Sequence, residues 1–212
     1  MRNKQTMWRF GLIAGAMVLA ASGQVAAQTM HRDGKPFAVV GERVDAPLPA
    51  GAKLAYMAGS AQGEFIAEFV NPQEDIARWQ TLFVAQQRVN DTLPNTVKRT
   101  LQAVQSTCDQ LSKPKFFAPK KGAARFQGQI LAVSLHCQQP MPNAPLGELT
   151  SMLFLQGQKH TFKYWRAWRP QNPQQLQKAL QEGVDFFSEG LKQVDLCQPQ
   201  AGHACRHPLL PQ

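Results

Sequence analysis

The chain has 212 residues and a formal net charge of +9 at pH 7, and 43% of its residues are hydrophobic. No second apolar run, internal repeat or long low-complexity linker divides it, which excludes repeat arrays and proteins with several membrane spans. Because its four cysteines include no Cys-x-x-Cys pair, a thioredoxin-like redox role has no support.

The first 27 residues have the features of a secretory signal peptide. Three cations stand in the first nine residues, residues 10–21 are apolar, and Val25-Ala26-Ala27 fits the small-residue cleavage rule. The apolar run of about a dozen residues is shorter than the roughly 20 that span a bilayer. We therefore expect Sec-type export and cleavage before Gln28. This leaves a periplasmic or secreted protein without a transmembrane anchor; an uncleaved anchor is the alternative.

The exported part has the size of one domain. We predict a cleaved signal peptide over 1–27, an extended arm over 28–52, an α+β domain over 53–196 and a disulfide-closed tail over 197–212. Early in the domain, residues 53–58 and 64–70 predict a pair of strands, because residues 64–70 alternate in polarity. Asn71-Pro72 and the two acids that follow predict a short helix. Residues 81–89 fit either a helix or a strand.

A better specified helix begins near Pro94, with an apolar stripe formed by Val97, Leu101, Val104, Cys108 and Leu111. Residues 126–137 predict a strand on which Leu131, Val133, Leu135 and Cys137 share one face. A helix that packs on a sheet brings two such apolar faces together. The sequence therefore predicts a disulfide between Cys108 and Cys137.

The stretch from Leu146 to Pro170 predicts a β-hairpin. Its arms are residues 149–155 and 160–168, and Gly157 lies in the turn between them. In the second arm Lys163, Trp165 and Arg169 share one face, and Phe162, Tyr164, Arg166 and Trp168 share the other. Two interpretations stay open for the first face: sheet core with solvated charges, or a docking surface.

A last helix is predicted from Asn172-Pro173 to about Val194. Its expected buried stripe is Leu176, Leu180, Val184, Phe187, Leu191 and Val194. Gly183 and Gly190 each lower helix stability by about 1 kcal/mol relative to alanine, so we expect them to permit close packing.

The tail contains Cys197 and Cys205. An even number of cysteines in an exported chain favours two disulfides, and pairing Cys108 with Cys137 leaves a second bridge between the tail cysteines. The rival interpretation is a metal site formed by Cys197, His203, Cys205 and His207, although their spacing matches no common zinc pattern. We predict the disulfide and no cofactor.

Positive charge is concentrated in residues 110–181, which hold ten lysines and arginines but a single acid, Glu148. Such asymmetry attracts anionic partners, although a solvated basic face that serves solubility is the alternative. The candidate binding residues are Lys113, Lys115, Lys120, Lys121, Arg125, Lys159, Lys163, Trp165, Arg166 and Arg169. The expected partner is an anionic envelope component or a protein. Export disfavours nucleic acid, and the oligomeric state is left open.

Catalytic motifs are weak. No Gly-x-Ser-x-Gly or His-Glu-x-x-His occurs, and the Ser-x-x-Lys match at Ser112 is interrupted by Pro114, which prevents the helix that this motif needs. We therefore predict no catalytic residues. A hydrolase assembled from distant residues is an alternative, and a subunit of a secretion or conjugation assembly is another. A pocket with a perturbed histidine or carboxylate favours the hydrolase, whereas a flat basic patch with an exposed Trp165 favours binding.

The order of residues 64–70, Trp79, the helix at Pro94 and the hairpin with Gly157, followed by an amphipathic helix, resembles small exported bacterial proteins with a PsbP-like α/β sandwich, a fold named for an extrinsic photosystem subunit. The resemblance covers about 54–194. It implies an antiparallel sheet with helices on its faces and an accessory or binding role, and it carries over no functional residues. The expected fold class is a single α+β domain: a mostly antiparallel twisted sheet, about three helices and disulfide staples.

Overall fold

The structure is a computed structural model that describes residues 43–45, 48–49, 51–59, 64–118, 128–141 and 143–197. The predicted signal peptide lies outside the described residues. So does the predicted bridge between Cys197 and Cys205, together with the alternative metal site in the tail.

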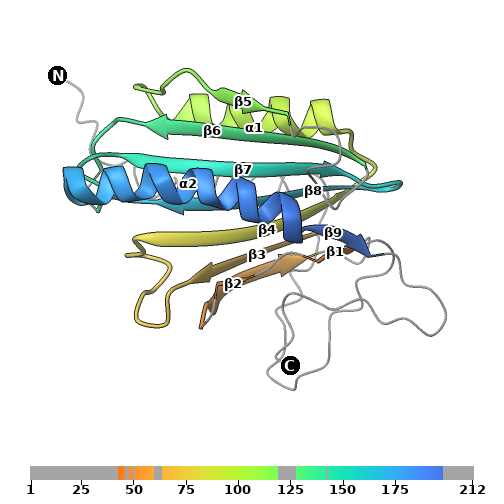
Figure 1. Ribbon diagram of the computed structural model, residues 1–212, viewed down its shortest axis with the longest axis horizontal. Coiled ribbons are helices and arrows are strands. Elements are labelled where there is room, and N and C mark those ends of the chain that lie inside the picture. The colour runs from red at the N-terminus through yellow and green to blue at the C-terminus, as the bar shows by residue number, and fades with distance from the viewer. Residues whose placement is uncertain are drawn as a thin grey trace, which may run out of the picture.

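Seven of the described strands form one sheet in the order β2-β3-β4-β8-β7-β6-β5, and every neighbouring pair is antiparallel (Figure 1). Their bounds are Lys53–Gly59 for β2, Phe65–Val70 for β3, Thr81–Val89 for β4, Lys115–Phe117 for β5, Gln129–Cys137 for β6, Glu148–Gln156 for β7 and His160–Trp168 for β8. The predicted hairpin is β7 and β8. It lies in the middle of the sheet because β8 also pairs with β4 along its whole length.

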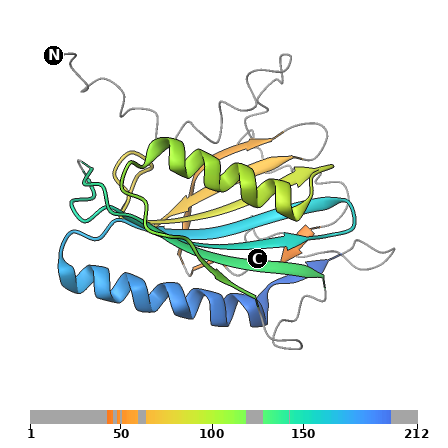
Figure 2. The ribbon, with the colours of Figure 1, turned by 90° about the horizontal axis from the view of Figure 1, so that it is seen from above.

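Two helices cover opposite faces of this sheet, α1 (Leu93–Thr107) on one side and α2 (Pro173–Gln193) on the other (Figure 2). Each begins at a polar cap that accepts a backbone N–H: Thr92 for α1 and Asn172 for α2. Each cap is followed by a proline in the first turn. The N–H that proline lacks would have no acceptor within the helix at that position, so the residue costs no hydrogen bond. The predicted starts of both helices are therefore confirmed.

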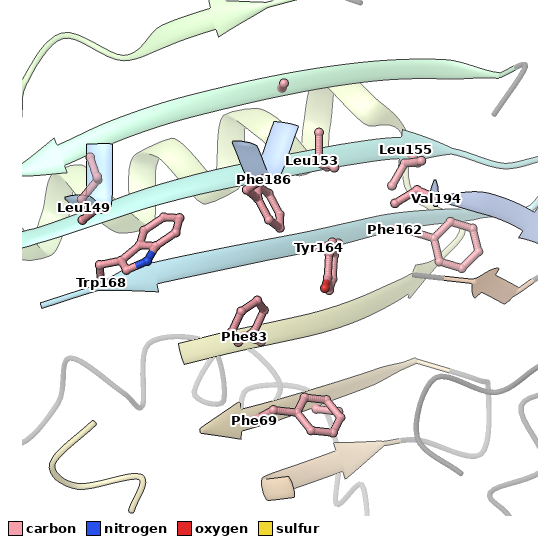
Figure 3. Close-up of a cluster of buried hydrophobic side chains, with 13 residues drawn as sticks. Phe69, Phe83, Leu149, Leu153, Leu155, Phe162, Tyr164, Trp168, Phe186 and Val194 are labelled. Carbon is pink, nitrogen blue, oxygen red and sulfur yellow. The ribbon is translucent and has the colours of Figure 1, made fainter. Parts of the chain in front are cut away.

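The α2 side holds the largest core cluster (Figure 3). Its aromatic side chains come from β3, β4, β8 and α2, and they are Phe69, Phe83, Phe162, Tyr164, Trp168 and Phe186. The α1 side is built around Val97, Val133 and Met152, with Leu101 and Val104 of the predicted stripe packed against them. The Cys108–Cys137 disulfide closes this side, with an S–S distance of 2.08 Å, and confirms the predicted pairing.

The predicted α+β class with about three helices is wrong. The described residues contain two helices, and the seven-stranded sheet dominates the fold. The expected helix after Asn71 is replaced by turns in which Asp75 accepts hydrogen bonds from the backbone N–H groups of Ala77 and Arg78. Strand β4 begins at Thr81, so the segment is too short to offset the cost of helix nucleation. Residues 81–89, which fitted two states, form β4.

The predicted buried stripe of α2 is wrong at Leu180 and Val184 and confirmed at its end, where Val194 is buried and Phe187 and Leu191 pack against the core. The helix buries Ala179, Gly183, Phe186 and Gly190, whereas Leu180 and Val184 are 48% and 60% exposed. A Cβ atom on Gly190 would lie 2.8 Å from Cδ1 of Leu153, so this side of the helix lies close against β7. The glycines therefore permit close packing, as predicted, and that packing leaves Leu180 and Val184 on the solvent side.

A second, two-stranded sheet joins distant parts of the chain. Strand β1 (Arg43–Asp45) pairs antiparallel with β9 (Asp195–Cys197). The predicted N-terminal arm and the end of the predicted domain therefore meet. In the described residues no helix is long and apolar enough to cross a membrane.

Candidate functional site: a cleft between α1 and the sheet

A cleft of about 660 Å³ lies between α1 and the face of the sheet on which α1 packs. Strands β3, β4, β8 and β7 supply its floor, and residues 96–108, from α1 and its C-cap, supply one wall. The strand register places the floor residues in rows across the sheet. Gln86, Lys163 and Phe154 form one row, and Glu68, Val84, Trp165 and Met152 form the next.

Lys163 is the central cation of the cleft. Its Nζ atom lies 4.1 Å from the centroid of the Trp165 ring and makes a long contact of 3.5 Å with Oγ1 of Thr100 on α1. No carboxylate among the described residues pairs with it. Burial, helped by the positive charge of Arg88, lowers the pKa of Lys163 to about 7.

Glu68 is the acid of the same floor. It is only 8% exposed, and its carboxyl group forms no hydrogen bond or ion pair with other described residues. Burial raises the pKa of Glu68 to about 7, because an unpaired carboxylate loses its hydration when it leaves water.

Glu68 and Lys163 are neighbours on this floor. They lie two strands and two residues apart, so strand spacings of about 4.8 Å and rises of about 3.4 Å put their Cα atoms roughly 12 Å apart. Trp165 belongs to the row of Glu68, and its ring lies under Nζ of Lys163. One small molecule in the cleft can therefore face both groups. Below neutral pH the pair is a cation and a neutral acid, and above neutral pH it is a neutral amine and an anion.

The remaining charges of the cleft are mostly paired. Arg99 on α1 pairs with Asp91, and Arg169 pairs with Glu148 at 3.0 Å. Arg88 makes no ion pair within the described part of the chain. At the Arg169 end lies Trp79, whose ring centroid is 3.7 Å from the guanidinium carbon and whose indole N–H has no acceptor in the structure described.

The structure separates the ten predicted binding residues. Lys163, Trp165 and Arg169 share a face as predicted, but that face is the floor of the cleft. Arg166 lies on the opposite face, where it pairs with Glu182 at 2.7 Å. Lys113, Lys115 and Lys159 are exposed outside the cleft, and Lys120, Lys121 and Arg125 lie outside the described residues.

Sequence reasoning missed Glu68, Arg88 and Thr100. The alternation of polarity over residues 64–70 puts Glu68 on the polar side of a half-buried strand, whereas β3 is buried on both faces. A signal was present: an acid within the apolar run of residues 65–70 is unusual for a central strand. Arg88 and Thr100 carried no comparable signal, because they come from two different elements that meet only in the fold.

The described residues contain no group of three or more His, Cys, Asp or Glu side chains able to hold a metal ion. Apart from the ion pairs of Arg99 and Arg169, the cleft holds one amine, one acid, the Arg88 guanidinium without an ion pair among the described residues, and an aromatic floor. No protein-family model, curated protein or solved structure matches this chain.

Proposed function

We propose that this is an exported accessory protein that binds an anionic molecule of the cell envelope in the cleft between α1 and the sheet. One observation carries the proposal: Lys163 lies in an apolar cleft where no carboxylate of the described residues pairs with it, close to Arg88, a second cation that makes no ion pair within the described part of the chain. Lys163 is half-buried, and lysines that are drawn out of water are rare unless they are paired, so an anionic ligand is the partner that this arrangement calls for.

The surroundings of Lys163 indicate what else the ligand contains. Trp165, Met152 and Leu82 offer apolar area along the floor, so the ligand has an apolar or aromatic part as well as its negative charge. Export is supported by the signal-like N-terminal residues and by the Cys108–Cys137 disulfide, since disulfides persist in oxidising compartments.

A thermal-shift screen of organic anions at low salt tests the proposal. We expect short-chain and aromatic carboxylates or phosphate monoesters to raise the Tm of the wild type and of Lys113→Met, whose lysine is exposed, but not of Lys163→Met. The shift should weaken from pH 6 to pH 8, because Lys163 loses its charge while Glu68 gains one. Added salt should weaken it as well. Equal shifts in the two lysine variants would refute binding in the cleft.

Hydrolysis is a second candidate function, and Glu68 favours it. A carboxyl group whose pKa lies near the working pH suits general acid–base catalysis, and Glu68 shares its cleft with an amine of similar pKa. A screen of chromogenic esters and glycosides would test this. Activity that survives in Glu189→Gln, an exposed control on α2, and disappears in Glu68→Gln would support catalysis; activity retained by Glu68→Gln would exclude Glu68 as the acid.

A further inference from the structure

We propose that Lys163 is a reactive amine that condenses with the carbonyl carbon of a small 2-oxo acid or related carboxylated aldehyde held in the cleft. The inference rests on the proposed function, because it requires the cleft to admit an anion. It goes further in assigning a covalent chemistry to one residue and a chemical class to the ligand.

The position of Lys163 is the first reason. Its row on the floor also holds Ile66 and Phe154, so an apolar side chain there would pack without desolvating a charge. A lysine at such a position is costly to keep. The side chain is also directed, since Nζ lies over the Trp165 ring and near Thr100 rather than in bulk solvent. The amine is thus held at a defined place inside a cleft.

The second reason is the availability of the neutral amine, the form that attacks carbonyl groups. Desolvation and an adjacent cation are the two means by which proteins activate lysine nucleophiles, and Lys163 has both. The Trp165 ring stabilises the ammonium form and so opposes desolvation and the adjacent cation, but such cation–π contacts contribute only about 0.5–2 kcal/mol. With a pKa of about 7, Lys163 is roughly half neutral at pH 7. This is on the order of 10³ times the neutral fraction of an ordinary lysine of pKa about 10.4.

The third reason is the charge around the amine, which fits a carboxylated carbonyl compound. The positive charge of Arg88 on β4 acts on Lys163, and Arg88 makes no ion pair within the described residues. Its guanidinium can therefore hold a carboxylate next to the carbonyl group. The other charged groups of the cleft are Glu68 of β3, which titrates near neutrality, and the two pairs Arg99–Asp91 and Arg169–Glu148. The pairs are neutral overall, so the net field at Lys163 depends on Arg88 and Glu68.

The reaction balances without any oxidant or reductant. The neutral amine of Lys163 attacks the carbonyl carbon, a C–N bond forms, and the carbonyl oxygen takes up a proton to give a carbinolamine. Loss of the nitrogen proton and of hydroxide, which leaves as water after protonation, gives the imine. Glu68 lines the same cleft and is partly protonated near pH 7, so it can supply the proton that the leaving oxygen takes up.

Reductive trapping tests the inference. The full exported protein is incubated with glyoxylate and cyanoborohydride at pH 7, and the modified lysines are located by peptide mass spectrometry. We expect Lys163 to be modified at least tenfold faster than the exposed Lys113 and Lys178 of the same molecule. Acetaldehyde, which lacks a carboxylate, should show a smaller preference for Lys163. Trapping at Lys163 no faster than at the exposed lysines would overturn the inference. The comparison is made within the wild-type protein, so it requires no variant.

Two variants separate reactivity from a structural role. Lys163→Met should lose the fast-trapped peptide, while Lys113→Met should keep it. Arg88→Gln should move the pH midpoint of Lys163 trapping upward, because removal of the adjacent cation raises the pKa of the amine. An unchanged midpoint would contradict the role of Arg88. If anions raise the Tm without any trapping at Lys163, the reactive-amine inference fails while the proposed binding function stands; if neither occurs, both fail.

Discussion

At the scale of single residues, the cleft shows how burial changes charge. Glu68 and Lys163 start from pKa values about six units apart in water, and desolvation brings both to about 7, because it disfavours the charged form of each. Neither side chain forms an ion pair with another described residue, so no opposite charge offsets the effect of desolvation on its pKa. By contrast, Arg166 is partly buried on the other face but is paired with Glu182 and lies over the Phe83 and Trp168 rings.

The raised pKa of Glu68 predicts how the stability of the protein changes with pH. Its folded pKa is raised, so its contribution to stability is fully present below the unfolded pKa and is lost as pH rises through about 7. The neutral analogue Glu68→Gln removes this loss. We expect the variant to be more stable than wild type at about pH 8, by up to roughly 3 kcal/mol, and to differ little at about pH 4. Urea unfolding at both pH values measures this, and Glu189→Gln should show no such pH-dependent difference.

At the scale of elements, α2 is held by close approach rather than by its largest side chains. Gly183 and Gly190 let the helix backbone lie near Ser151 and Leu153 of β7. The Phe186 ring of α2 packs on the Tyr164 ring of β8, with the two ring centroids 5.4 Å apart. The consequence is a helix whose most buried positions are three small residues and Phe186, with Phe187 and Leu191 partly buried beside them.

Gly190→Ala tests the close approach. Alanine favours helix by about 1 kcal/mol, but its Cβ would lie 2.8 Å from Cδ1 of Leu153, which is fully buried and has little room to move. We expect a net destabilisation of about 1–2 kcal/mol. Chemical denaturation should show it, whereas Ser188→Ala on the exposed side of α2 should be neutral or slightly stabilising. A stabilised Gly190→Ala protein would mean that the helix can shift away from β7.

Phe186→Ala and Leu180→Ala distinguish the observed face of α2 from the predicted one. Phe186 is 8% exposed, so its truncation should cost about 3–5 kcal/mol, while Leu180 is 48% exposed and its truncation should cost less than about 1 kcal/mol. The comparison needs only thermal or urea unfolding of the two variants. Equal costs would favour the predicted stripe over the observed packing.

At the scale of the whole molecule, the fold is a seven-stranded sheet covered on both faces, with the small β1–β9 sheet beside it. Strands β4 and β8 are neighbours in the sheet, although their paired residues Val89 and His160 lie 71 positions apart in the chain. The two halves of the chain therefore join at the centre of the sheet. The Cys108–Cys137 disulfide adds a covalent link where α1 ends beside β6. That link also fixes one end of the cleft, because both cysteines line it.

Removal of this disulfide should therefore weaken the fold and the cleft together. The bridge spans a sequence separation of 29 residues, for which the loss of unfolded-state entropy corresponds to about 3–4 kcal/mol. We expect Cys108→Ser with Cys137→Ser to lose that amount in denaturant unfolding, and ligand-induced Tm shifts to decrease. Thiol titration of the native wild type should find these two cysteines unreactive. A change near zero would show that α1 is held by packing alone.

Much of this protein was determined by local sequence. The cap and proline at each helix start, the stripe of α1 as far as Val104, the hairpin turn at Gly157 and the alternation that places Lys163 with Trp165 all follow from neighbouring residues. The predicted continuation of the helical stripe to Leu111 is wrong, because α1 ends at Thr107. The Cys108–Cys137 pair also followed, since two apolar faces in one domain must meet.

Tertiary structure alone decided three other features. The face that α2 buries depends on how closely β7 lets Gly183 and Gly190 approach, which helical periodicity does not contain. Residues 81–89 became a strand because β3 and β8 offered them partners on both edges. The cleft brings Glu68, Arg88 and Lys163 from three strands under one helix. Their chemistry arises from shared burial, a property of the assembled fold that no single segment carries.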